Sequence, residues 1–137
     1  MKQFISVYGF VIMPNHIHVV WEMLKPNGKE IPSASFMKFT AHAFEKHIGN
    51  TNIADLKNYS TNADDRKYNF WQSYPDAFLL TNPKTIIQKL DYMHNNPLQP
   101  HWQLALDPID YPYSSARFYN TGEKNFGFLS DYRDWAG

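Results

Sequence analysis

Apolar and β-branched residues at the start of the chain predict a β-hairpin. Phe4 to Met13 is rich in Phe, Ile, Val and Tyr, and His16 to Leu24 has the same character, which is typical of strands. Pro14-Asn15 between the two segments supplies a turn. Gly9 interrupts the first segment, and a glycine within a strand marks a bulge or the close approach of another backbone. We therefore expect two antiparallel strands that pair through this turn.

The segment after Pro32 predicts a long helix. Ser33 or Ser35 can cap this helix, which we expect to run to about Ile48 and to stop at Gly49-Asn50. The apolar positions that recur at helical spacing are Phe36, Phe39, Ala43 and Phe44.

A second helix is predicted from Lys84 to about Asn95. Asn82-Pro83 marks its start, because Asn is a favoured N-cap and Pro is favoured at the first helical position. Pro97 ends it, because the residue before a proline disfavours helical backbone angles. The positions expected to be buried are Ile86, Ile87, Leu90 and Met93.

The remaining segments carry weaker patterns. A short helical turn is expected near Ile53–Leu56 and a short helix at Ser114–Tyr119. Tyr68–Gln72 and Ala77–Leu80 have the character of strands, interrupted by Tyr74-Pro75-Asp76. The length of 137 residues predicts a single domain over residues 1–137.

Composition narrows the classes of function only in part. Thirteen basic and thirteen acidic residues give no net charge, so composition by itself does not indicate a nucleic-acid-binding protein. The chain has no cysteine, which excludes disulfides, thiolate zinc sites and thiol nucleophiles and fits a reducing, cytoplasmic setting. No apolar stretch approaches the roughly 18 residues that a membrane span needs, so we expect no membrane partner.

His16 and His18 are the first candidate functional residues. Side chains alternate between the two faces of a strand, so both imidazoles project to one side while Ile17 and Val19 project to the other. Two imidazoles in this relation can bind one divalent ion. The alternative is that both are partly buried histidines, hydrogen-bonded within the sheet.

Tyr92 and Asn96 are the second pair. They are four residues apart near the end of the second predicted helix, so they lie on one face of it. A free tyrosine titrates near pH 10, so a tyrosine nucleophile needs help from a cation or a base. A metal held by His16 and His18, with the Asn96 oxygen as a third ligand, would polarise a phosphate under attack. The alternative for Tyr92 is an amphipathic residue at the rim of the core, because the chain has nine tyrosines.

Three short motifs occur in order along the chain, and a fourth precedes the second of them. They are Met13-Pro14-Asn15-His16-Ile17-His18, Tyr92-Met93-His94-Asn95-Asn96-Pro97, Tyr111-Pro112-Tyr113-Ser114-Ser115-Ala116 and, ahead of the tyrosine helix, Phe70-Trp71-Gln72. From about Val7 to Tyr132 the chain resembles the HUH single-tyrosine transposases, both the insertion-sequence type and its REP-associated relatives. The motifs together, in this order and at these distances, are specific to that family.

The resemblance implies a ferredoxin-like α+β fold with an antiparallel sheet and helices packed on it, in a protein that acts as a homodimer. Such proteins cut single-stranded DNA at ends marked by hairpins, using Mg²⁺ or Mn²⁺. The tyrosine attacks a phosphodiester and forms a covalent 5′-phosphotyrosyl link, which a DNA 3′-hydroxyl later reverses. Carried over to this chain, Tyr92 is the nucleophile, and His16, His18 and Asn96 lie on the metal side. His94 and Asn95 receive no catalytic role.

This chain departs from the family pattern at its start. In the family a strand and a helix precede the strand that leads into the histidine motif, and here the chain opens almost at that strand. We therefore expect an exposed sheet edge beside Phe4–Met13, covered by a second copy. The resemblance and basic residues along the chain predict binding of single-stranded or hairpin DNA. The basic candidates are Lys38, Lys46, Arg66, Lys67 and Arg117.

Three other functions compete with a cutting enzyme of this family. A domesticated or decayed transposase would grip hairpin DNA without cleaving it. A His-triad phosphoesterase would need a third alternating histidine, and the next position on that face is Val20. A purely structural module explains none of the motifs.

Overall fold

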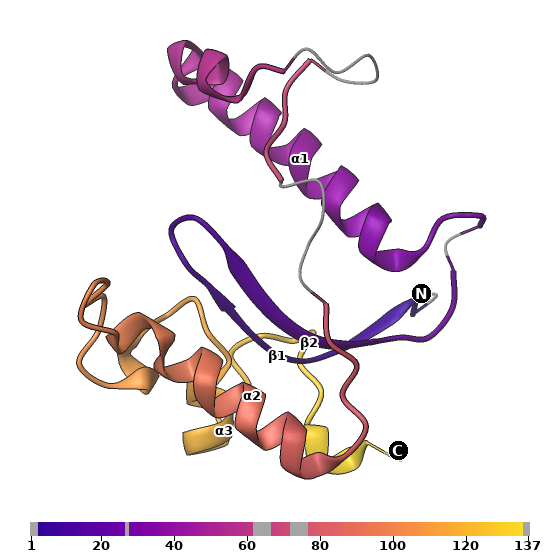
Figure 1. Cartoon of the computed structure of the whole chain (residues 1–137), viewed down its shortest axis with the longest axis vertical. Helices are drawn as coiled ribbons and strands as arrows, with labels where there is room; N and C mark the ends of the chain where they lie inside the picture. Colours follow the sequence, from indigo (N-terminus) through magenta and orange to yellow (C-terminus); the bar gives the residue numbers. More distant parts are fainter. Residues whose placement is uncertain (1–2, 27, 62–66, 72–76, 136–137) are drawn as a thin grey trace. The chain divides into compact units, whose positions relative to one another are not determined.

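A computed structural model of the chain describes residues 3–26, 28–61, 67–71 and 77–135. The chain divides into two compact units, which are described separately (Figure 1). The hairpin unit comprises Met1–Leu24 and Leu79–Gly137, and the α1 unit comprises Lys25–Phe78.

The hairpin unit begins with two antiparallel strands, β1 (Ile5–Ile12) and β2 (Ile17–Met23). Their bounds agree with the sequence prediction to within one residue at each end, and the turn falls at Pro14-Asn15. The register shifts between Val7 and Gly9, which is the bulge that the glycine predicted. The α+β class with an antiparallel sheet is therefore confirmed, and the sheet of the described residues has two strands.

Helix α2 (Pro83–Asn95) runs alongside this hairpin (Figure 1). The Asn82 side chain accepts a hydrogen bond from the backbone N–H of Thr85 at 3.0 Å, which confirms the predicted cap. A short turn of 3₁₀ helix, η2 (Asn96–Leu98), follows it. The predicted burial of Ile87 is wrong, because this side chain is 41% exposed on the flank of the helix.

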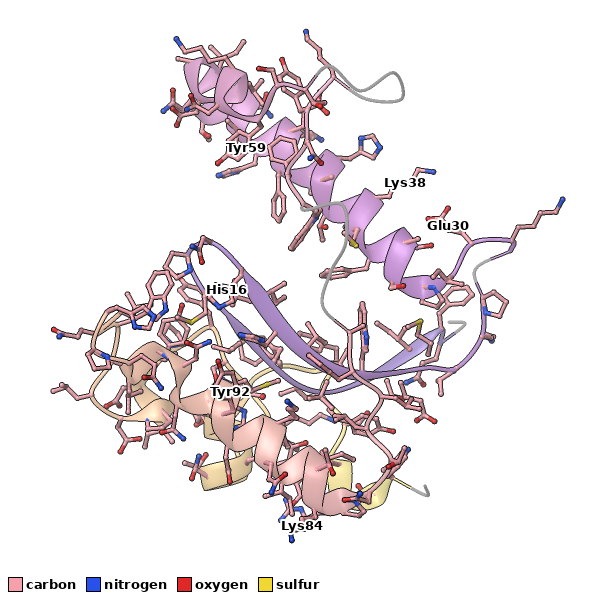
Figure 2. All side chains as sticks on the ribbon, viewed as in Figure 1. His16, Glu30, Lys38, Tyr59, Lys84 and Tyr92 are labelled. Atoms are coloured by element: carbon pink, nitrogen blue, oxygen red, sulfur yellow. The ribbon has the colours of Figure 1, made fainter. Side chains whose placement is uncertain are left out.

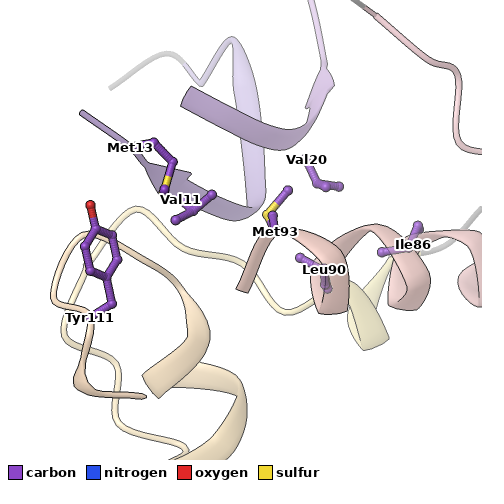
Figure 3. Close-up of a cluster of buried hydrophobic side chains, with 7 residues drawn as sticks. All are labelled: Val11, Met13, Val20, Ile86, Leu90, Met93 and Tyr111. Carbon is purple, nitrogen blue, oxygen red and sulfur yellow. The ribbon is translucent and has the colours of Figure 1, made fainter. Parts of the chain in front are cut away.

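One apolar cluster joins α2 to the hairpin (Figure 3). Its buried members are Val11, Met13, Val20, Ile86, Leu90, Met93 and Tyr111. Val20 lies on the same face of β2 as the two histidines, so this cluster packs on the histidine face of the sheet. Ile17 and Val19 on the other face are only half-buried. The two histidines therefore lie on the sheet face that carries this apolar cluster.

Gly9 allows α2 to approach β1 closely. A Cβ atom at this position would lie 2.2 Å from Cδ2 of Leu90 and 3.3 Å from Oγ of Ser115, both of which belong to buried residues. We predict that Gly9→Ala lowers the free energy of unfolding by about 1–3 kcal/mol, because the added methyl group overpacks this contact. Urea unfolding measures the change. Gly127→Ala is the control, since a Cβ there meets no described atom within 4 Å. An unchanged unfolding midpoint for Gly9→Ala would contradict the packing.

The C-terminal part of the hairpin unit pairs with the outer edge of β1. The backbone N–H of Ile12 donates to the carbonyl of Tyr113 at 2.8 Å, and the N–H of Ser115 donates to the carbonyl of Phe10 at 3.0 Å. Further along, the N–H of Ser130 donates to the carbonyl of Val7. The predicted exposed edge beside Phe4–Met13 is therefore wrong, because the chain's own C-terminal segments cover much of it.

Short helical turns complete the hairpin unit. They are η3 (Pro108–Asp110), α3 (Ala116–Thr121) and η4 (Tyr132–Asp134). Helix α3 corresponds to the helix predicted at Ser114–Tyr119, but it is shifted by two residues. Ser114 lies before the helix, because its hydroxyl accepts a hydrogen bond from the backbone N–H of Ala116. Gly122, in the left-handed region with φ of 75°, ends it.

The α1 unit is built on helix α1 (Pro32–Thr51), followed by a 3₁₀ turn, η1 (Ile53–Tyr59). The predicted caps at Ser33 and Ser35 are wrong, because the helix begins at Pro32 with Ile31 as the capping position and no side-chain cap. The helix also passes through Gly49-Asn50 and ends three residues beyond Ile48. Among the described residues no helix is long and apolar enough to cross a membrane.

Aromatic side chains hold the rest of this unit against α1. Trp71 donates a hydrogen bond from Nε1 to Oγ1 of Thr40 at 2.9 Å, and the Phe44 ring contacts Trp71 and Phe70. The strand predicted at Tyr68–Gln72 is wrong in its described part, where the backbone makes a single bridge from Tyr68 to Ser60. The segment 77–80 forms no strand either, and Tyr74-Pro75-Asp76 lies outside the described residues.

Candidate functional site

The turn end of the hairpin and the C-terminal end of α2 enclose a cleft of about 470 Å³ within the hairpin unit. Figure 2 labels His16 near the turn and Tyr92 on α2. The residues that line the cleft are Asn15, His16, His18, Tyr92, Asn96, Gln99, His101 and Trp102. All four residues that the sequence predicted as nucleophile or metal ligands thus lie around one cleft.

The two histidines face each other across one side of β2. Their ring centroids are 5.0 Å apart and the rings are perpendicular, as the alternation of strand side chains predicted. Nδ1 of His16 lies 2.6 Å from Oδ1 of Asn15. The tautomer with its proton on Nδ1 would donate to this amide oxygen and leave the lone pair on Nε2. Asn15 therefore orients this imidazole with its acceptor nitrogen away from the turn.

The pKa of His18 is lowered from its ordinary value, first by burial and then by the charges of His16 and Lys89. Burial penalises the imidazolium form, so His18 is neutral at pH 7. A neutral imidazole is the form that binds a metal ion.

Asn96 completes this side of the cleft. Its side chain is buried, with 7% exposed, and its Nδ2 lies 3.4 Å from Nε2 of His16. Rotation of the amide about its last torsion angle exchanges the nitrogen and oxygen positions and would turn Oδ1 toward the imidazole. The described residues contain no cluster of three His, Cys, Asp or Glu side chains suited to a metal. The donors available for a metal ion here would be two imidazoles and one amide, a set that suits a divalent transition ion better than Mg²⁺.

Tyr92 faces the histidine pair from the last turn of α2. Its ring lies 5.9 Å from that of His18, edge to face, and the side chain is 62% exposed. The phenol is therefore accessible to a large substrate. The C-terminal end of a helix carries partial negative charge, which disfavours a phenolate or a phosphate there. A cation beside His16 and His18 would offset this charge.

Comparison with known proteins gives no relative from which a function could be transferred. Neither the models of known protein families, nor the curated proteins, nor the solved structures contain a match to this chain.

His94 links elements of the hairpin unit. It is buried on α2 behind the cleft, and its Nε2 lies 2.7 Å from Oγ of Ser115. The same hydroxyl accepts the backbone N–H of Phe10 at 3.0 Å. One serine thus links α2, β1 and the Tyr111–Ala116 motif. His94 and Ser115, which belong to two different motifs, thus hold elements together and do not line the cleft.

Burial lowers the pKa of His94 from 6.5 to about 4, against a smaller opposite effect of Asp91. Between these values the unfolded chain binds a proton that the folded chain does not. The free energy of unfolding is therefore not reduced by His94 above pH 6.5. As the pH falls toward 4, protonation of His94 in the unfolded chain lowers it by up to about 3 kcal/mol. We predict that His94→Gln, which cannot titrate, flattens the pH dependence of urea unfolding over this window. The same slope in both proteins would contradict the assignment.

The basic residues predicted to contact DNA lie in different settings. Lys38 on α1 pairs with Glu30, which precedes that helix, at a distance of 3.8 Å. Both residues are labelled in Figure 2. The guanidinium of Arg117 donates to the carbonyl of Ile109 and pairs with Glu123. Arg66 lies outside the described residues. Lys46 and Lys67 line one open cleft of the α1 unit together with His42 and Glu45.

Sequence reasoning did not single out four residues that line the cleft. Asn15 belongs to the predicted turn, which indicates no role at a site. Gln99, His101 and Trp102 follow α2 in a segment without periodicity. Their roles depend on how the segment after Pro97 folds back toward the hairpin, which no local pattern specifies. The proline-rich composition of this segment, next to the tyrosine motif, was the only available signal.

Proposed function

We propose that this protein is a metal-dependent tyrosine transposase that cuts and rejoins single-stranded or hairpin DNA. The observation that carries the proposal is the convergence of Tyr92 with His16, His18 and Asn96 on one cleft. These four residues come from segments more than 70 positions apart in the sequence. The exposed phenol of Tyr92 beside the imidazoles of His16 and His18 supports this proposal over a purely structural role for these side chains.

The reaction that fits this cleft is attack on a phosphodiester. Oη of Tyr92 forms a bond to phosphorus, the bond from phosphorus to the 3′ oxygen breaks, and that oxygen takes up the proton as a 3′-hydroxyl. The product is a 5′-phosphotyrosyl link with an energy similar to the bond broken. A DNA 3′-hydroxyl can therefore reverse the step on another strand, and no nucleotide cofactor is needed.

His16, His18 and Asn96 would hold the divalent ion. When bound, such an ion supplies a Lewis acid that polarises the phosphate. Asn15 fixes the ring of His16 through the 2.6 Å contact to Nδ1, which is the outer-shell contact that metal-binding histidines usually make. The desolvation that keeps His18 neutral serves the same end.

The protein's setting and partners form part of the proposal. The absence of cysteine suits a reducing, cytoplasmic setting. The homodimer follows from the family resemblance alone, because the edge of β1 that motivated it is paired within the chain. Light scattering at micromolar concentration distinguishes a dimer from a monomer.

A cleavage assay tests the proposed function. The protein is incubated with Mn²⁺ and labelled hairpin-bearing single strands, and the products are separated on denaturing gels. We expect a cut strand together with a slower protein–DNA adduct, both lost when EDTA removes the metal. Cleavage without an adduct would overturn the tyrosine mechanism in favour of hydrolysis by water. Binding without cleavage would favour the non-cleaving hairpin-DNA-binding protein.

Lys46 and Lys67 are the basic candidates that share a cleft, and they test the DNA contact. We predict that Lys46→Gln and Lys67→Gln each weaken binding of single-stranded DNA and reduce the slope of log affinity against log salt by about 1, as the loss of one phosphate contact would. Lys57→Gln, on η1 of the same unit and outside the cleft, is the control. Equal salt slopes for all four proteins would assign these lysines to the solvated surface.

A further inference from the structure

An indole side chain stands in the cleft beside the histidines. Trp102 packs against the apolar core of the hairpin unit and also lines the cleft. Its ring lies 6.0 Å from that of His16, and the ring of His101 lies 5.5 Å from it on the neighbouring position. Part of the indole is thus anchored by the core while part faces the space into which Tyr92 also points.

The backbone holds Trp102 in a closed turn. The N–H groups of Trp102 and Gln103 both donate to the carbonyl of Gln99 at 2.9 Å, and the N–H of Leu104 donates to the carbonyl of Pro97 at 2.8 Å. Gln103 has φ of 48°, in the left-handed region that a side chain other than glycine seldom adopts. Such strain persists only where surrounding contacts fix the backbone. The turn therefore fixes the backbone from which the indole projects.

The chemistry of the cleft selects the kind of group that meets this indole. No acidic side chain is among the described residues that line the cleft, so an anionic strand is not repelled. Its volume of about 470 Å³ is within the range of pockets that hold a single small ligand, so it suits one nucleotide and not a duplex. Aromatic faces bind bases by stacking, whichever base is present.

We propose that Trp102 is a stacking platform for one nucleobase of the DNA strand, adjacent to the phosphate that Tyr92 attacks. This inference rests on the proposed function and adds to it a means of positioning. Stacking of one base would fix the strand in the cleft, so that the neighbouring phosphate lies between the phenol and the imidazoles. Trp102 thus acts on where the strand is cut, through the base, and not on the bond that breaks.

The test combines protein variants with DNA that lacks a single base. Binding is measured on the Tyr92→Phe background, which keeps the strand uncut, with hairpin-bearing single strands that carry an abasic site at each position in turn. Trp102→Leu keeps an apolar side chain against the core but removes the aromatic face. We expect it to weaken binding of intact DNA roughly 5- to 150-fold, the equivalent of one stacked base. Trp102→Phe should restore part of the affinity.

The decisive result is the coupling between the two changes. At one position the abasic site should weaken binding to the protein with Trp102 and have no further effect on Trp102→Leu. Trp135→Leu is the control, since this indole also packs on the core but does not line the cleft. A loss of affinity in Trp102→Leu that is the same at every abasic position, or no loss, would overturn the inference.

The same measurements separate this inference from the proposed function. An adduct formed by the wild-type protein without any coupled position would overturn the stacking platform and leave the transposase intact. A coupled position without an adduct would support the platform and overturn the tyrosine mechanism. A wild-type protein that binds no single-stranded DNA would overturn both.

Discussion

Tyr92→Phe is expected to abolish the covalent protein–DNA adduct and to lower the rate of strand cleavage by at least about 10³-fold, the scale on which the loss of a nucleophile acts. The substitution removes one oxygen, and the ring of Tyr92 keeps its edge-to-face contact with His18. DNA affinity should therefore change little. Denaturing gels measure the adduct, and filter binding measures the affinity.

Tyr113→Phe is the matched control for this result. Tyr113 is also an exposed tyrosine of the hairpin unit, and it lies outside the cleft. It should form the adduct at the wild-type rate. An adduct that persists in Tyr92→Phe would contradict the assignment of the nucleophile, and an adduct lost in both variants would indicate a general effect of tyrosine removal on DNA binding.

His16→Ala and His18→Ala are each expected to abolish Mn²⁺-dependent cleavage. Each removes one of two imidazoles that lie on one face of β2, and the remaining imidazole and amide are too few ligands to retain the ion. Mn²⁺ should also raise the melting temperature of the wild-type protein, because the ion binds only the folded chain. Neither variant should show this rise, and this readout requires no DNA.

The control for the histidine variants is His101→Ala, which changes an exposed imidazole of the same cleft outside the predicted ligand set. It should keep both the cleavage and the thermal shift. The buried-histidine alternative predicts a different pattern. In that case His16→Ala or His18→Ala would lose the cooperative unfolding transition, and Mn²⁺ would not change the melting temperature of the wild-type protein.

The elements that position the site follow from local sequence. The hairpin is specified by two runs of strand-forming residues around Pro14-Asn15, and α2 by the Asn82 cap and Pro83. Strand alternation places His16 and His18 on one face, and a four-residue spacing places Tyr92 and Asn96 on another. Each of these relations joins residues two or four positions apart at the end of one element, so periodicity is enough to predict it.

The relations that the sequence did not predict are between elements. Whether β1 has a free edge depends on Tyr113 and Ser115, about 100 residues away, whose backbone groups pair with it. Ile87 fits the helical stripe of α2, yet it lies beyond the area that the narrow hairpin covers. Tyr68–Gln72 has the composition of a strand, but its described aromatic rings pack on α1. No partner strand pairs with this segment in the described residues, so it forms no strand there.

Mass spectrometry of the protein–DNA adduct is the most direct test of the central claim. Wild-type protein is allowed to react with a hairpin-bearing single strand in Mn²⁺, the DNA is trimmed by nuclease, and the protein is digested with trypsin. Cleavage after Lys89 and Arg117 releases one peptide that contains Tyr92, Tyr111 and Tyr113. Fragmentation of this peptide is expected to place the 5′-phosphonucleotide on Tyr92. A modification on either of the other two tyrosines, or an unmodified peptide from a reaction that has cut the DNA, would contradict the proposed mechanism.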